Sequence, residues 1–378
     1  MDNFINIPLA NNIKTANYLH FLSTRYFPVK IGLSYLKSLF FRIINETHNQ
    51  PTDRIECVDR DFFAPLPKNF VIEPGAYCNL NCCFCPTGRR ETELPKGFMR
   101  FETFRKIVSK ISPHAKCIAL YNWGEPLLNP DILKMISFCY RNGISTLVDS
   151  NLSIRNMDKK DAELIVRSGL TSLKVAIDGC SQATYEKYRR GGNFDRAISN
   201  LSTLVEEKNR IGSETPHIEW KFLINRYNQD ELLRAVKTAN LIGVRITFKL
   251  MDVWNEETWE SKFHKKISAP KIFGKKKKSC SSPHSIEDLQ IHPTLPNWCK
   301  QLFNTMIINW DGNVLPCCNV YKTHFYLGNI LEQDLEELWN SAAFKSCRKF
   351  ILNYGPKQSG RSVCESFDCP LGRKYIGH

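Results

Sequence analysis

The sequence predicts an α/β protein, a partial (β/α)6 barrel with a small Cys-rich C-terminal domain and a helical N-terminal extension. Three observations support this prediction: strand-like apolar runs alternate with amphipathic helical stretches from residue 69 onward, several of those stretches end at glycine, and cysteines gather near the C-terminus. Such alternation is typical of parallel β/α units joined by right-handed crossovers. Six units would curl into a partial barrel, with function at the C-terminal strand ends.

The individual elements follow from local periodicity. The strand-like runs are short and apolar and lie at residues 69–75, 117–122, 145–149, 172–178, 217–224 and 245–251. Helical periodicity fills the intervals, near residues 101–111, 130–142, 158–168, 181–211 and 229–242. Gly143, Gly169 and Gly243 stand where a helix commonly ends, because glycine adopts a left-handed cap conformation without strain. We therefore place the barrel domain at residues 69–252.

The flanking segments differ from the barrel in composition. Residues 1–68 form an aromatic-rich helical extension, which we expect to pack on the barrel, with a membrane surface or a partner as alternatives. Residues 253–294 form a basic linker, with eight lysines between Lys262 and Lys278. Such a charge run usually is a solvated linker. Residues 295–378 form a compact Cys-rich tail.

The net charge of +14 is compatible with nucleic acid, an anionic membrane face or an acidic substrate. Few aromatic residues interleave with the lysines, which argues against nucleic acid. Residues 1–4 do not open a signal peptide, and the most apolar stretch, residues 27–44, is too charged to span a bilayer. Fifteen cysteines clustered at metal-like spacings then favour a reducing cytoplasm.

The most informative motif is the cysteine run that follows the first expected strand, Cys78, Cys82 and Cys85. Three thiolates can hold three irons of a four-iron cluster, which normally takes four, so one iron would stay open to another ligand. Zinc is the alternative, since Cys-x-x-Cys pairs commonly bind it. Three features weigh against zinc: Cys78 in addition to the Cys82–Cys85 pair, the aromatic Phe84, and the position of the run directly after a strand. Cys83 does not fit the ligand spacing.

This spacing resembles the CxxxCxxC signature of the radical S-adenosyl-L-methionine (SAM) enzymes. In that family the amino and carboxylate groups of SAM chelate the open iron of a [4Fe-4S] cluster, and the core is a partial (β/α)6 barrel. The resemblance covers about residues 69–252. It implies that Cys78, Cys82 and Cys85 hold the core cluster, with Phe84 beside the cofactor.

A second match follows the second expected strand. Trp123-Gly124-Glu125 is similar to the start of the family's Gly-Gly-Glu-Pro motif, whose backbone carbonyls and Glu receive the SAM ammonium. Trp123 replaces the first glycine, and its ring could narrow the pocket. Ser150 and Asn151 end the third strand where the family usually shows Thr-Asn near the ribose.

Three further positions depend on the same resemblance. The Asp178-Gly179 pair ends the fourth strand without the Ser that often precedes the family's Ile-Asp-Gly, which shifts the expected contact with the SAM carboxylate to Arg189. A guanidinium suits a carboxylate through paired hydrogen bonds, and Arg190 is the alternative. Asn228 resembles an Asn near the nucleoside, with a helix cap as the alternative.

The tail carries a second cysteine set. Cys299, Gly312 and Cys317 resemble the opening of SPASM and shorter twitch auxiliary-cluster domains. Residues 306–315 read as a hairpin with an Asp-Gly turn, which would bring the two cysteines together. Cys364 and Cys369 would complete four thiolates for one auxiliary [4Fe-4S] cluster, with four-Cys zinc as the alternative.

The resemblance implies reductive cleavage of SAM to methionine and a 5'-deoxyadenosyl radical, which removes a hydrogen atom from an unactivated carbon. We expect a peptide or protein substrate, because the extension and the basic linker could dock an acidic segment, and we expect the auxiliary cluster to accept an electron. The alternatives are a small-molecule dehydrogenase or epimerase, for example on an aminosugar, and a non-enzymatic zinc-binding scaffold. An electron donor such as flavodoxin or ferredoxin is the expected partner.

Overall fold

The computed structural model describes residues 62–253, 256–264 and 301–353. The expected N-terminal extension lies almost wholly outside these residues, as do most of the lysine-rich linker and the predicted ligands Cys299, Cys364 and Cys369. None of the helices in the described part of the chain is long and apolar enough to cross a membrane.

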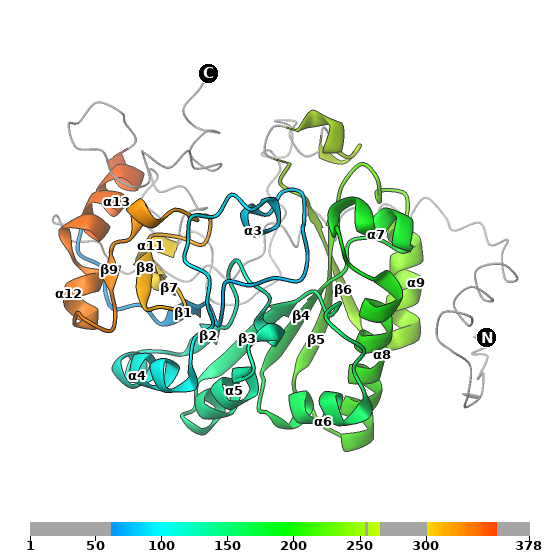
Figure 1. Cartoon of the computed structure of the whole chain (residues 1–378), viewed down its shortest axis with the longest axis horizontal. Helices are drawn as coiled ribbons and strands as arrows, with labels where there is room; N and C mark the ends of the chain where they lie inside the picture. The colour runs from blue at the N-terminus through cyan, green and yellow to red at the C-terminus, as the bar shows by residue number, and fades with distance from the viewer. Residues whose placement is uncertain (1–61, 254–255, 265–300, 354–378) are drawn as a thin grey trace, which may run out of the picture.

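The described residues form one nine-stranded sheet with the strand order β6-β5-β4-β3-β2-β1-β7-β8-β9 (Figure 1). The six barrel strands pair in parallel and confirm the six expected ones. Their bounds are β1 Asn69–Ile72, β2 Cys117–Ala119, β3 Ser145–Ser150, β4 Ser172–Ala176, β5 His217–Ile224 and β6 Arg245–Leu250. Because β6 ends the sheet without meeting another strand, the barrel is partial, as expected.

The helices cover one side of this sheet (Figure 1). Their bounds are α4 Phe101–Ile111, α5 Ile132–Arg141, α6 Lys159–Arg167, α7 Gln182–Tyr188, α8 Phe194–Ile211 and α9 Leu232–Ile242. Gly143, Gly169 and Gly243 adopt positive φ after α5, α6 and α9, as the helix-stop prediction required.

One helix prediction was wrong. The stretch 181–211 forms two helices, α7 and α8, and not one. Gly191 takes φ +79 between them, a conformation that breaks helical geometry, and the side chain of Asn193 accepts from Arg196 N to cap α8. The break places Arg189 in a turn at the end of α7.

The C-terminal elements extend the barrel sheet at the β1 edge. β7 (Thr305–Ile308) pairs in parallel with β1, and β8 (Asn313–Leu315) returns antiparallel to β7, which confirms the expected hairpin. Gly312 adopts φ +87 in its turn. β9 is Gly328–Asn329, and the short helices are α3 Pro86–Arg89, α11 Gln301–Asn304, α12 Leu335–Trp339 and α13 Ala342–Asn353. The parallel contact of β7 with β1 was not predicted.

The buried guanidinium of Arg348 ties these C-terminal elements together. Its Nε donates to Leu302 O at 2.8 Å, and its Nη2 donates to Trp339 O at 2.8 Å. Its Nη1 donates to Phe62 O at 3.2 Å, just before the first barrel strand. One side chain therefore satisfies backbone carbonyls from three separate segments, which a buried cation requires.

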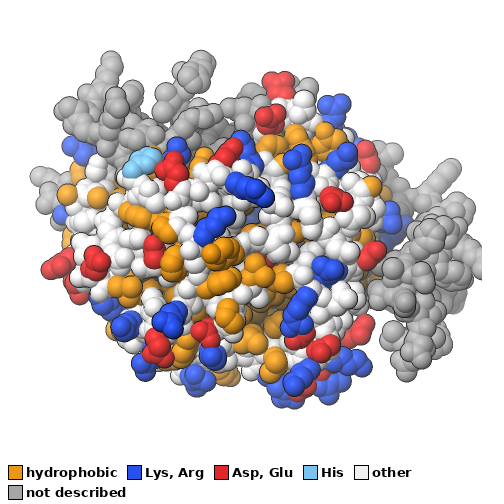
Figure 2. Space-filling model, in the orientation of Figure 1, with side chains coloured by type: hydrophobic (Ala, Val, Ile, Leu, Met, Phe, Trp, Pro, Cys, Tyr) orange, Lys and Arg blue, Asp and Glu red, His pale blue; other side chains and the backbone are white. Residues whose placement is uncertain are grey.

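Strand alternation separates a helix-covered face from an interior face. On β5, Trp220, Phe222 and Ile224 are buried in the large core shared with the helices, whereas Lys221 and Leu223 are half-buried on the other face. A second, smaller core lies where the C-terminal elements meet β1, and it includes Val71, Leu94, Ile307, Leu315, Val320 and Phe325. Figure 2 shows basic and acidic side chains interspersed over one outer face.

Candidate active site

The cysteine run forms a loop held against the ends of the barrel strands. Asn81 N donates to Arg190 O at 2.9 Å, and Cys85 N donates to Cys82 O at 3.2 Å. A Cβ on Gly88 would lie 2.4 Å from Cys82 N, so α3 presses against the loop and only glycine fits there. Two N–H groups approach sulfur atoms: Leu80 N lies 3.5 Å from Cys78 Sγ, and Arg189 Nη1 lies 3.9 Å from Cys82 Sγ.

The three thiols form an electrostatically coupled group. Burial, together with the nearby Glu125, Cys82 and Cys85, raises the pKa of the Cys78 thiol to about 12. Burial likewise raises the pKa of Cys82 to about 11. Among the described residues, no three His, Cys, Asp or Glu side chains gather around a position for a single metal ion. The mutual electrostatic influence of Cys78, Cys82 and Cys85 places the three thiols near one another.

Glu125 joins the second and third strand ends. Its side chain is only 3% exposed, and it accepts from Ser150 Oγ at 2.7 Å and from Asn151 N at 2.9 Å. Burial raises its pKa to about 7. Asn151 Nδ2 also donates to Asn79 Oδ1 at 3.0 Å, inside the cysteine loop. Residues predicted separately from three motifs are therefore brought together by one hydrogen-bond network.

Gly124 explains how closely the second strand end approaches the cysteine loop. A Cβ at this position would lie 1.8 Å from Gly75 O and 3.0 Å from Tyr77 O. The next residue donates its backbone N–H to Tyr77 O at 2.7 Å. Any side chain at Gly124 would force these two segments apart, so glycine is a geometric requirement here.

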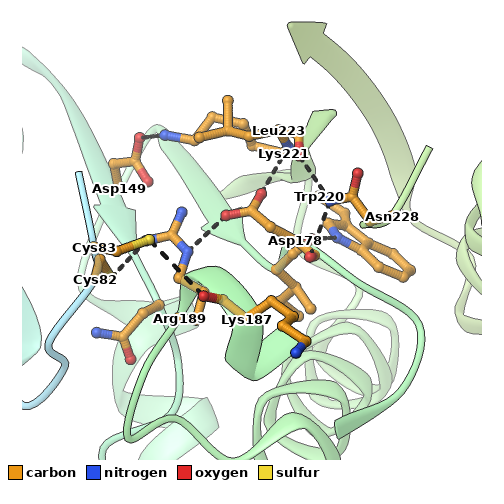
Figure 3. Close-up of polar contacts among 12 residues, drawn as sticks. Cys82, Cys83, Asp149, Asp178, Lys187, Arg189, Trp220, Lys221, Leu223 and Asn228 are labelled. Carbon is orange, nitrogen blue, oxygen red and sulfur yellow. Dashed lines mark hydrogen bonds and ion pairs between the residues drawn. The ribbon is translucent and has the colours of Figure 1, made fainter. Parts of the chain in front are cut away.

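Arg189 lies between an acid and a predicted iron ligand (Figure 3). Its Nε donates to Asp178 Oδ2 at 2.6 Å, while its Nη1 faces Cys82 Sγ. The side chain of Arg189 is 13% exposed and that of Asp178 is fully buried. Asp178 Oδ1 also accepts from Leu223 N at 2.6 Å. Sequence reasoning quoted Asp178 as part of a strand-end motif but did not assign its carboxylate, which only the fold reveals as the partner of Arg189.

Arg190, the alternative to Arg189, and Asn228, the residue predicted near the nucleoside, lie in different surroundings. Arg190 has an exposed side chain, and its carbonyl holds the cysteine loop. Asn228 is buried and donates to Asp178 O at 3.1 Å and to Leu223 O at 2.9 Å. It does not occupy the N-cap of α9, which is Glu231. Its contact with the nucleoside stays a prediction.

Trp123 and Glu73 connect the site to the C-terminal elements. Trp123 Nε1 donates to Val320 O at 2.8 Å, and its ring meets Tyr321 edge-on at 5.8 Å between centroids. The ring therefore packs against the C-terminal segment. Glu73 Oε1 accepts from Trp123 N at 2.9 Å, whereas its buried Oε2 has no hydrogen-bond partner. Burial raises the pKa of Glu73 to about 7. Sequence reasoning missed Glu73, which fell inside the expected strand 69–75.

Aromatic rings gather around Phe84. Trp259 packs edge-on against it at 5.1 Å, and Tyr188 lies at 6.3 Å. Tyr227 in turn lies 4.7 Å from Trp259. Trp259 falls in the expected linker, yet Arg226 N donates to its carbonyl at 3.0 Å and holds this part of the segment on the barrel. Sequence reasoning missed this aromatic group, since Trp259 stands outside any motif.

The buried carboxyl of Glu73 predicts a pH effect on stability. Its pKa rises from 4.5 to about 7 on folding, so its stabilising contribution is full below pH 4.5 and is lost as pH rises through 7. A Glu73→Gln variant lacks this loss, because the amide does not ionise. The stability of the variant relative to wild type should rise by about 3 kcal/mol between pH 4.5 and 8.

Denaturant unfolding of the apoprotein at both pH values measures this difference. The exposed Glu337→Gln is the matched control and should behave as wild type. A pH-independent difference for Glu73→Gln would contradict the buried, protonated state.

A loop with one buried and two half-buried thiols at the C-terminal edge of an open β/α barrel is typical of an iron–sulfur protein whose cluster keeps room for a further ligand. Residues 72–216 match the Radical SAM superfamily, and residues 299–370 match SPASM, an iron-sulfur cluster-binding domain. The chain belongs to the radical SAM superfamily and carries a SPASM domain after its barrel.

The chain resembles two named proteins and a solved structure. The chain is 22% identical over 307 residues to a tungsten-containing aldehyde ferredoxin oxidoreductase cofactor-modifying protein of Pyrococcus furiosus, covering 76% of this chain and 85% of that protein. It is 20% identical over 298 residues to the Fe-coproporphyrin III synthase of Methanosarcina barkeri, covering 69% and 71%. The crystal structure of Streptococcus suis SuiB bound to S-adenosylmethionine has a TM-score of 0.56 at 15% identity, covering 95% of this chain and 80% of SuiB.

The protein is therefore an enzyme whose core domain binds a [4Fe-4S] cluster with SAM, and its SPASM domain indicates an auxiliary iron–sulfur cluster. All four predicted auxiliary ligands fall inside the matched SPASM residues. Of these, Cys317 is described: it is half-buried beyond the end of β8 and packs on the smaller core. The particular ligands of both clusters stay predictions.

Proposed function

We propose that this enzyme is a radical SAM oxidoreductase that abstracts a hydrogen atom from a peptide or protein substrate, with the auxiliary cluster accepting an electron. The observation that carries the proposal is the parallel pairing of β1 with β7. The cysteine triad follows β1, and Cys317 follows the hairpin that β7 begins, so one sheet supports ligands predicted for both clusters. Together, the core cluster and SAM supply hydrogen-atom abstraction from an unactivated carbon.

In this proposal the described residues have separate roles in binding the core cluster and SAM. Cys78, Cys82 and Cys85 would hold irons, and the close approach at Gly124 would leave backbone carbonyls for the SAM ammonium. Arg189 would bind the SAM carboxylate and balance the negative charge of the Cys82 thiolate. The other predicted contacts are Phe84, Trp123, Glu125, Ser150, Asn151 and Asn228. Glu125 acts by fixing the turn, because its oxygens already accept from neighbouring groups.

Two comparisons bear on the substrate. The SuiB structure bound to its precursor peptide SuiA shares this fold, with a TM-score of 0.53, and it favours a peptide substrate. The names of the Pyrococcus and Methanosarcina relatives instead favour a cofactor or another small molecule, which is the second candidate. We place the enzyme in the cytoplasm, with a flavodoxin or ferredoxin as electron donor.

The proposed function is tested with anaerobically reconstituted enzyme, SAM and a reductant. Candidate peptides encoded beside the gene are compared with porphyrin and aminosugar substrates, and mass spectrometry detects loss of hydrogen from each. We expect oxidised peptide together with 5'-deoxyadenosine. Oxidation of a small molecule alone would overturn the peptide assignment in favour of the second candidate.

Cys317, a predicted ligand of the auxiliary cluster, allows a direct test of the electron-accepting role. Cys317→Ser should lower the amount of oxidised product formed per 5'-deoxyadenosine by roughly tenfold, because the substrate radical loses its electron acceptor. Cys318→Ser is the matched control: it is the neighbouring cysteine, its Sγ contacts Gln301, and it is not a predicted ligand. Equal product ratios in the two variants would contradict the electron-accepting role.

A further inference from the structure

Three lysines line the interior face of the barrel sheet on neighbouring strands. Lys174 lies on β4, Lys221 on β5 and Lys249 on β6, and all three are half-buried. In the strand register, Lys174 pairs with Glu219, and Lys221 pairs with Thr247, so these side chains share the face opposite the helix-covered core. They are therefore close neighbours inside the open barrel.

The acids on this face leave the lysines incompletely neutralised. Lys221 forms an ion pair with Asp149, and both side chains are about one-fifth exposed, at 21% and 19%. Glu219 accepts from the Thr247 hydroxyl and forms an ion pair with Arg245 Nε at 3.9 Å. Within the described residues, Lys174 and Lys249 form no ion pair. Three ammonium groups thus share this face with two carboxylates, of which Asp149 pairs with Lys221 and Glu219 with Arg245.

This arrangement has an energetic cost that an anion would remove. Burial lowers the pKa of Lys249, and the charges of Lys174 and Lys221 lower it further. Solvated lysines on an outer surface avoid such a cost, because they extend into water and are screened. A half-buried group of like charges is stabilised when a carboxylate or phosphate binds between them.

The lysines also adjoin the candidate active site. Asp149, the partner of Lys221, directly precedes Ser150, whose hydroxyl donates to Glu125. Figure 3 draws the Asp149–Lys221 pair together with Arg189 and Cys82. A molecule bound by the lysines would therefore lie next to the residues predicted to bind SAM, Ser150, Glu125 and Arg189.

We propose that Lys174, Lys221 and Lys249 bind an anionic group of the substrate, a carboxylate or a phosphate, inside the barrel. This inference rests on the proposed function, since it assigns the barrel interior to the substrate. It narrows the substrate class to molecules that carry such an anion near the carbon that loses hydrogen. An acidic side chain or the C-terminal carboxylate of a peptide meets this requirement, as does a phosphorylated or carboxylated small molecule.

Binding of simple anions to the reconstituted enzyme tests the proposal. SAM is kept saturating so that the site at Arg189 is filled, and ionic strength is held constant with sodium chloride. Calorimetry then compares inorganic phosphate with succinate, which separates the phosphate source from the carboxylate source. Lys249→Met should weaken binding of the preferred anion by at least about tenfold. Lys160→Met, on the exposed face of α6, should bind it as wild type does.

Two further variants separate charge from packing. Lys249→Arg keeps the positive charge and should retain affinity within about threefold of wild type. An equal loss of anion affinity in Lys249→Met and Lys249→Arg would overturn the proposal. The proposal would also fail if wild type bound phosphate and succinate no more strongly than it binds chloride. 5'-Deoxyadenosine formation by wild type without substrate reports on the proposed function separately, so failure of one inference is distinguishable from failure of the other.

Discussion

Replacing Cys78, Cys82 and Cys85 together by alanine is expected to abolish SAM cleavage. A thiolate is an iron ligand in its own right, so its loss removes the bond outright and leaves no partial activity to detect. The measurement is 5'-deoxyadenosine formed by anaerobically reconstituted enzyme.

The loop supplies its own control for this experiment. Cys83 lies between two predicted ligands, yet its Sγ approaches Lys187 O at 3.8 Å and does not fit the ligand spacing. Cys83→Ala should therefore keep near-normal 5'-deoxyadenosine formation. The triple variant should still bind iron and sulfide through the SPASM domain. Undiminished SAM cleavage by the triple variant would defeat the ligand assignment.

The barrel was predictable because its signals are local. The strand pattern of β5 can be recognised from a few consecutive residues. The glycines after α5, α6 and α9 likewise mark the helix ends locally. The single helix expected over 181–211 failed for the same reason. Its periodicity continues across the break, whereas the left-handed Gly191 that separates the two helices lies beside Asn79 and Asn81 of the cysteine loop.

The pairing of β7 with β1 had no such signal. Thr305–Ile308 is a short apolar run more than two hundred residues from Asn69–Ile72, and nothing local specifies its partner. The hairpin turn at Gly312 was predictable, because the Asp-Gly pair acts on its own neighbours. Sequence therefore identified the hairpin but not where it docks.

The same distinction applies to the site. The cysteine triad could be predicted because ligand spacing is itself the signal. Asp178, Glu73 and Lys249 could not, because their roles depend on what they meet after folding: a guanidinium, a backbone turn and two other lysines. A buried acid at a strand end is chemically informative only once its neighbours are known.

Arg189→Leu is expected to have the second large effect, on stability and on SAM binding together. The variant leaves the fully buried Asp178 without its cation, and removing one partner of a buried pair costs about 3–5 kcal/mol. It also removes the guanidinium proposed for the SAM carboxylate. Arg190→Leu is the matched control, since that side chain is exposed, and it should change either quantity little. Denaturant unfolding of the apoprotein measures stability, and equilibrium dialysis of the reconstituted enzyme measures SAM affinity.

A second substitution separates the two roles of Arg189. Adding Asp178→Asn to Arg189→Leu removes the stranded charge, while the asparagine oxygen can still accept from Leu223 N. Part of the lost stability should therefore return, because no uncompensated ion stays buried. SAM affinity should not return, because the guanidinium is still absent. Wild-type SAM binding by the double variant would show that Arg189 serves only to pair with Asp178, and its assignment to the SAM carboxylate would then pass to another residue.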